Sequence, residues 1–169
     1  MRPQDIAVQR HLNTKMLRKI LKIAALVLAT VFIGMQFFAI DKTRPPIVPS
    51  ETLEAGISVP ADISMLLGRS CNNCHSHKTV YPWYANIQPA GWFLKDHIEH
   101  GSEHLNFSVF NTYSTDKKAK KLDEICEEVK AGRMPLPSYL LLHRDAELTD
   151  SERQAVCSWA EAESGKLQR

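Results

Sequence analysis

Two cysteines and a histidine stand close together in the segment "CNNCHSHKTVYPWY", residues 71–84. They are Cys71, Cys74 and His75, in the spacing C-x-x-C-H. Thiols so spaced suit three kinds of chemistry: thiol–disulfide exchange, metal binding with two further ligands, and covalent attachment of haem. The surrounding sequence discriminates among them.

The context of the motif favours haem. A thioredoxin-like dithiol needs a βαβ setting, and no stretch of this chain alternates as a strand would. Structural zinc needs four ligands, but Cys126 and Cys157 lie far apart in sequence and have no histidine beside them. Haem attachment needs only the pentapeptide, because the thiols add to the vinyl groups and the histidine ligates the iron. We therefore predict one covalent haem c on Cys71, Cys74 and His75.

A second axial ligand is predicted at Met134, in the segment "AGRMPLP". This methionine follows a helix stop at Gly132 and precedes two prolines, so its thioether would stand on a stiff loop. A methionine that fills a gap in the core is the alternative. His104 and His97 are the other candidates for this axial position.

Aromatic residues follow the motif and are predicted to wall the haem. Burial by such rings excludes water and raises the reduction potential of a haem. The same rings could also serve as ordinary core of a small domain. The residues concerned are Tyr81, Trp83 and Trp92.

Four helices are predicted around these residues. They cover residues 60–70, 90–100 and 116–131, and a last one begins at residue 149. Gly101 is predicted to end the second, with Trp92, Phe93 and Ile98 as its apolar members. The third has a buried face of Leu122, Ile125, Cys126 and Val129. The predicted fold class is all-α, a small cytochrome c-like domain.

Two features belong to the last helices. Thr149 and Glu152 have the spacing of a capping box, which fixes the start of the final helix. Cys126 and Cys157 could form a disulfide between the last two helices in an oxidising compartment, or remain two buried thiols. The sequence leaves both possibilities open.

The N-terminal part indicates a membrane anchor. The stretch from Ile23 to Ile40 has 18 residues without a charge, close to the roughly 20 that cross a bilayer as a helix. Six basic residues and one acidic residue precede it, so residues 1–22 are predicted to be a cytoplasmic tip. Residues 41–60 contain four prolines and are predicted to be an extended linker, before a haem domain over 61–169.

The charge distribution along the chain argues against nucleic acid as a partner. The whole chain has a net charge of +2, which the basic tip more than accounts for, so the remainder is mildly acidic. Nothing in it indicates binding to nucleic acid. The predicted location is the inner membrane, single-pass, with the haem domain in the periplasm.

Three segments in order resemble the bacterial haem-binding domain family of small exported or membrane-anchored cytochrome c-like proteins. They are "CNNCHSHKTVYPWYANIQPAGW", "GSEHLNFSVF" and "AGRMPLPSYLLLHRDAELTDSERQAVCSWA", and the resemblance covers about residues 44–162. It implies haem on Cys71, Cys74 and His75, with Met134 at the position of the family's M-P methionine. Ser102 and Phe110 depart from the pattern, which commonly has a charged residue and a tryptophan there.

The predicted function is that of a membrane-anchored monohaem c-type cytochrome that transfers electrons to or from a redox partner protein in the periplasm. An electron carrier of this kind needs no catalysis of its own. The alternative is a peroxidase-like haem enzyme or a gas or redox sensor, in which the distal position is exchangeable and a histidine such as His97 or His104 acts as acid or base.

Overall fold

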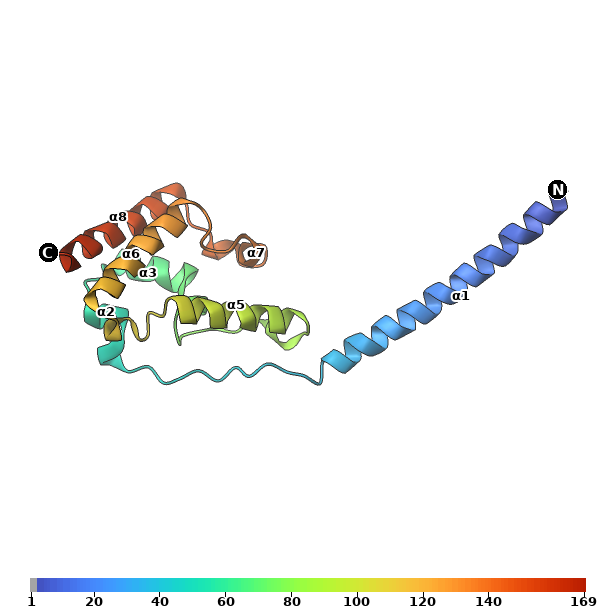
Figure 1. Cartoon of the computed structure of the whole chain (residues 1–169), viewed down its shortest axis with the longest axis horizontal. Coiled ribbons are helices and arrows are strands. Elements are labelled where there is room, and N and C mark those ends of the chain that lie inside the picture. The colour runs from blue at the N-terminus through green and yellow to red at the C-terminus, as the bar shows by residue number, and fades with distance from the viewer. Residues whose placement is uncertain (1–2) are drawn as a thin grey trace. The chain divides into compact units, whose positions relative to one another are not determined.

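The computed structural model describes residues 3–169 of the chain, with side chains from residue 14 onward, and every regular element within that range is helical (Figure 1). This confirms the all-α prediction. The longer helices are α1 (Pro3–Met35), α3 (Ala61–Ser70), α5 (Ala90–His104), α6 (Thr115–Lys130) and α8 (Asp150–Leu167). The shorter ones are η1 (Pro49–Glu51), α2 (Leu53–Gly56), α4 (Asn72–His75), η2 (Trp83–Asn86), η3 (Phe110–Thr112), α7 (Pro137–Leu140) and η4 (Arg144–Ala146).

The chain forms two compact units. One contains α1, the residues after it up to Asp41, and the segment Trp83–Phe93. The other contains Lys42–Pro82 and Leu94–Arg169.

Hydrogen bonds from the side chains of Gln36 and Trp92 hold the first unit together. The Nε2–H of Gln36 donates to the carbonyl oxygen of Gln88 at 3.0 Å, and the backbone N–H of Gln88 donates to Oε1 of Gln36 at 2.9 Å. The indole N–H of Trp92 donates to the carbonyl oxygen of Phe38 at 2.9 Å. These bonds tie the segment after α1 to the residues around Gln88.

The predicted membrane span over residues 23–40 differs from the helix observed. Helix α1 ends at Met35, and Lys22 stands immediately before the uncharged stretch, so the uncharged part of the helix runs only from Ile23 to Met35. Across the described part of the chain, no helix has both the length and the apolar character needed to traverse a bilayer.

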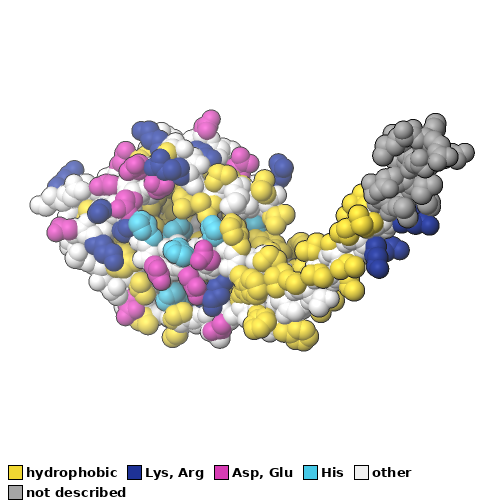
Figure 2. Space-filling model, turned by 45° about the vertical axis from the view of Figure 1, so that its right-hand side comes forward, with side chains coloured by type: hydrophobic (Ala, Val, Ile, Leu, Met, Phe, Trp, Pro, Cys, Tyr) yellow, Lys and Arg dark blue, Asp and Glu magenta, His cyan; other side chains and the backbone are white. Residues whose placement is uncertain are grey.

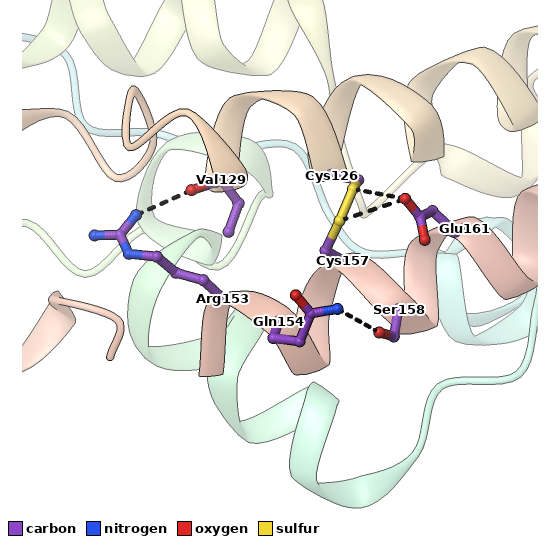
Figure 3. Close-up of a disulfide and its surroundings, with 7 residues drawn as sticks. All are labelled: Cys126, Val129, Arg153, Gln154, Cys157, Ser158 and Glu161. Atoms are coloured by element: carbon purple, nitrogen blue, oxygen red, sulfur yellow. Dashed lines mark hydrogen bonds between the residues drawn. A yellow bond between two sulfur atoms is a disulfide. The ribbon is translucent and has the colours of Figure 1, made fainter. Parts of the chain in front are cut away.

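The core of the second unit lies around α6 and α8, which run side by side (Figure 1). The predicted face of α6 is confirmed, since Leu122, Ile125, Cys126 and Val129 are all buried. The predicted capping box of α8 is also present: the Thr149 hydroxyl accepts from the N–H of Glu152, whose carboxylate accepts from the N–H of Thr149. A disulfide joins Cys126 to Cys157 and so links the two helices (Figure 3).

Residues 41–60, predicted to be an extended linker, contain η1 and α2. Leu53 of α2 is only 1% exposed and belongs to the core. Its backbone N–H donates to the carbonyl oxygen of Phe107 at 2.8 Å. This part of the segment therefore packs as part of the second unit.

The sequence predicted that helix α5 would end at Gly101, but the helix continues to His104. Glycine at this position permits close packing: a Cβ there would lie 3.1 Å from the carbonyl oxygen of Cys74. Of the three predicted apolar members of the helix, Ile98 is buried as expected, whereas Trp92 and Phe93 are exposed, and Leu94 is buried instead.

Candidate functional site

The C-x-x-C-H motif forms a single helical turn. Helix α3 buries Ile63 and Leu67 and ends at Ser70, so the chain enters the motif directly from the core, as predicted. Within the turn, the backbone N–H groups of Cys74 and His75 donate to the carbonyl oxygen of Cys71 at 3.1 and 3.0 Å.

Two cavities open beside this turn. The first has a volume of about 440 Å³ and is lined by Cys71, Cys74 and His75 among others. The second, of about 500 Å³, has apolar walls that include Phe107 and Val129. Both volumes lie in the range of small-molecule and cofactor pockets. The residues lining both cavities are Ser70, Cys71, His75, His104, Met134 and Pro135.

His75 presents one ring nitrogen as a ligand. Its Nδ1–H donates to the carbonyl oxygen of Leu105 at 3.1 Å, which assigns the proton to Nδ1 and leaves the lone pair of Nε2 available. Burial lowers the pKa of His75, against the raising effect of the bond to Leu105, so the imidazole is neutral at neutral pH. A neutral imidazole with a backbone-anchored Nδ1 is the form that ligates iron.

Both cysteines of the turn are free thiols. Burial raises the pKa of Cys71 to about 12, with a smaller contribution from Cys74. Burial also raises the pKa of Cys74, and the nearby charge of Arg44 opposes that shift. Both side chains are therefore protonated thiols at neutral pH, with no disulfide between them.

Met134 lines both cavities and stands on a braced loop. Its backbone N–H donates to the carbonyl oxygen of Glu128 at 3.2 Å. From α8, the Nη1–H of Arg153 donates to the carbonyl oxygens of Val129 at 3.0 Å and Met134 at 3.5 Å; Figure 3 shows the first of these bonds. The structure thus brings Met134 to the same cavities as Cys71 and His75, although 59 positions separate Met134 from His75 in sequence.

The histidines of α5 reach the first cavity because the helix continues past Gly101. His97, His100 and His104 all line this cavity, and His104 also lines the second. Figure 2 shows histidine side chains gathered on one face, with acidic side chains among them. His97 and His104 therefore remain candidates for the distal side.

The three aromatic residues predicted to wall the haem do not line these cavities. Trp83 is 72% exposed and belongs, with Trp92, to the first unit. Tyr81 is half-buried and contacts Lys42, whose Nζ lies 5.9 Å from the ring centroid. The aromatic rings that do line the cavities are those of Tyr139 and Phe107.

Sequence reasoning missed Tyr139 and Ser70. The Tyr139 hydroxyl accepts from Nδ2–H of Asn73, a residue inside the C-x-x-C-H motif, at 2.9 Å. The Ser70 hydroxyl is buried, lines both cavities and has no hydrogen-bond partner. In the sequence, only the position of Ser70 immediately before Cys71 could have indicated that it lines the site.

Two thiols, a neutral imidazole, a thioether and apolar walls around adjoining cavities form the donor set of a haem site, so the residues present fit that cofactor. This fold and site define a helical haem-binding protein.

Comparison with known protein families agrees with the assignment of a haem-binding protein. The chain matches the haem-binding domain family over residues 30–162, which is most of its length, and it belongs to that family. Neither a curated protein nor a solved structure gives a significant match.

Proposed function

We propose that this protein is a monohaem c-type cytochrome that transfers single electrons. The observation that carries the proposal is the turn itself: two free thiols and an imidazole with an available Nε2 face one cavity. Bound there, a haem supplies a one-electron iron couple in surroundings of low polarity.

The chain's residues have distinct roles in this proposal. Cys71 and Cys74 hold the cofactor through thioether bonds, so it does not dissociate. His75 is the proximal ligand, and the Leu105 carbonyl fixes its ring orientation and its tautomer. Met134 is the second ligand, supported by its place on both cavities and by the backbone bonds that brace its loop. Apolar walls such as Phe107 and Val129 exclude water.

A second candidate function is a peroxidase-like enzyme or a gas sensor. The observation that favours it is the row of histidines from α5 that lines the first cavity, since a histidine near an open axial position can act as acid or base. Rapid binding of carbon monoxide to the reduced protein supports this second function. A reduced spectrum that carbon monoxide leaves unchanged supports electron transfer.

We place the haem domain in the periplasm, held at the inner membrane by the N-terminal segment, with another redox protein as partner. The apolar side chains of α1 between Ile23 and Phe32 are exposed, and basic residues such as Lys19 and Lys22 precede them. Apolar surface of this kind next to cationic residues suits a membrane, with the basic end on the cytoplasmic side. Fractionation of cells followed by an alkaline wash tests this, and recovery of the protein in the soluble fraction contradicts it.

The test of the cofactor is a pyridine haemochrome spectrum of the full-length protein made in a host that matures c-type cytochromes, with haem staining of the same band on a denaturing gel. We expect one covalent haem per chain. The double variant Cys71→Ser, Cys74→Ser should lose the stained band, whereas Cys126→Ala, Cys157→Ala should keep it. A wild-type band without haem contradicts the proposal.

A further inference from the structure

Arg44 connects the proline-containing segment after α1 to the C-x-x-C-H turn. Its Nε–H and Nη2–H both donate to the hydroxyl of Thr79, at 3.0 and 2.7 Å. Nη2 also lies 3.5 Å from the carbonyl oxygen of Ser76 and 3.5 Å from the hydroxyl of Ser102. One guanidinium therefore joins the segment after the turn to helix α5.

The groups that accept from Arg44 are themselves bonded to the turn. The Thr79 hydroxyl donates to the carbonyl oxygen of Asn73 at 2.8 Å, and the Ser102 hydroxyl donates to the carbonyl oxygen of Cys74 at 2.9 Å. The guanidinium is thus linked to two residues of the C-x-x-C-H turn, in each case through one intervening hydroxyl group. A fixed geometry at this point matters because Cys74 and His75 must present their side chains to the same cavity.

The charge of Arg44 is not neutralised by an ion pair. Its acceptors are two hydroxyls and a carbonyl, all of them neutral. Within residues 14–169, where side chains are described, no carboxylate forms a salt bridge with Arg44, whereas the exposed Arg69 pairs with Glu152 at 2.9 Å. Arg44 is also partly buried, so solvent screens its charge less than that of a surface residue.

We propose that Arg44 is a positioning residue of the haem site, which holds the C-x-x-C-H turn and raises the reduction potential through its unneutralised charge. The inference rests on the proposed covalent attachment of haem at this turn. A ferric centre carries one more positive charge than a ferrous one, so a fixed cation nearby disfavours the ferric state.

Two substitutions in the full-length holoprotein separate charge from geometry. Arg44→Gln removes the charge and keeps hydrogen-bonding capacity, while Arg44→Lys keeps the charge and loses the planar fork. Lys42→Gln is the matched control, because it removes one positive charge two residues away in the same segment. The readout is the midpoint potential from a spectroscopic redox titration, with haem per chain measured on the same samples.

We expect Arg44→Gln to lower the potential, with the equilibrium constant for reduction falling roughly threefold or more, as for the loss of one weakly screened charge. Arg44→Lys should keep most of the wild-type potential, and Lys42→Gln should change it less than Arg44→Gln does. An Arg44→Gln holoprotein with the wild-type potential overturns the inference. So does an Arg44→Lys protein whose potential falls as far as that of Arg44→Gln, because geometry alone would then explain the effect.

A further variant covers the case in which Arg44→Gln does not accumulate. Ser102→Asp places a carboxylate beside the guanidinium with Arg44 retained, and Ser102→Asn is its control, since both lose the hydroxyl bond to Cys74 and only the first adds a charge. The potential of Ser102→Asp should lie below that of Ser102→Asn, and equal potentials overturn the inference. The proposed function fails in a different way, since a wild-type protein without covalent haem has no potential to measure. Wild-type haem content is therefore determined first.

Discussion

The Nδ1–H of His75 donates to the carbonyl oxygen of Leu105 at 3.1 Å, which joins the C-x-x-C-H turn to the residue that follows α5. The backbone gives a second link, because the N–H of Phe107 donates to the carbonyl oxygen of His75 at 2.7 Å. The imidazole is thereby fixed from a segment 30 residues away in sequence. The fold, and not the motif alone, therefore places the imidazole proton on Nδ1 and leaves Nε2 without one.

This relationship predicts the behaviour of His75→Ala. Cys71 and Cys74 remain for the proposed thioether bonds, so we expect covalent haem with an altered visible spectrum, because the proximal nitrogen is lost. Added imidazole should restore a spectrum close to that of the wild type. Absorption spectra with and without imidazole measure the effect, and a variant spectrum identical to wild type contradicts the assignment.

Met134→Ala should open the distal side. We expect faster binding of carbon monoxide to the reduced protein and a lower potential, because a thioether stabilises the ferrous state. His104→Ala and His97→Ala are the matched variants and should leave both properties near wild type. If His104→Ala opens the distal side and Met134→Ala does not, the second ligand is His104.

Gly101→Ala should destabilise the protein by about 1–3 kcal/mol, the usual effect of overpacking. The added Cβ would meet the carbonyl oxygen of Cys74 at 3.1 Å and its Cβ at 3.2 Å, and Ser102 holds that carbonyl in place. Gly165→Ala is the control, since a Cβ there meets nothing within 4 Å and alanine favours a helix. Urea unfolding compares the two, and equal stabilisation by both would show that the turn yields freely.

The Cys126–Cys157 disulfide closes a loop with a sequence separation of 31. Replacing both cysteines with alanine should lower the free energy of unfolding by about 3–4 kcal/mol on the chain-entropy model. Denaturant unfolding of the two holoproteins measures this. A thiol titration of the denatured, unreduced Cys71→Ser, Cys74→Ser protein should find no reactive thiol, and two titratable thiols would contradict the bridge.

Glu152 should make stability depend on pH. The backbone N–H of Thr149, and then Arg69, lower the pKa of this carboxyl in the folded protein. Its contribution to the free energy of unfolding is therefore present above the carboxyl's unfolded pKa, and it is lost as pH falls through the lower folded pKa. The difference between wild type and Glu152→Gln should shrink on acidification. Thr149→Val keeps the backbone N–H and loses only the hydroxyl bond to Glu152, so its destabilisation should depend on pH more weakly.

Local sequence patterns account for several features of the fold. The capping box of Thr149 and Glu152, the buried face of α6 and the helix that leads into Cys71 follow from neighbours along the chain. Gly101 misled the prediction because glycine has two uses. It often ends a helix, but here it lets α5 approach Cys74 closely, which depends on a contact remote in sequence.

The sequence by itself determined which donor groups share one helical turn, because the spacing of Cys71, Cys74 and His75 is a local property of the chain. Only the tertiary structure decided what surrounds that turn: the carbonyl of Leu105 on the imidazole, Met134 on both cavities, and Arg44 hydrogen-bonded to the residues that hold the turn. The physical reason is the separation along the sequence of the residues that interact. Motifs, caps and helix faces arise from residues within a few positions of one another, whereas cavities and long-range hydrogen bonds arise from how distant segments pack.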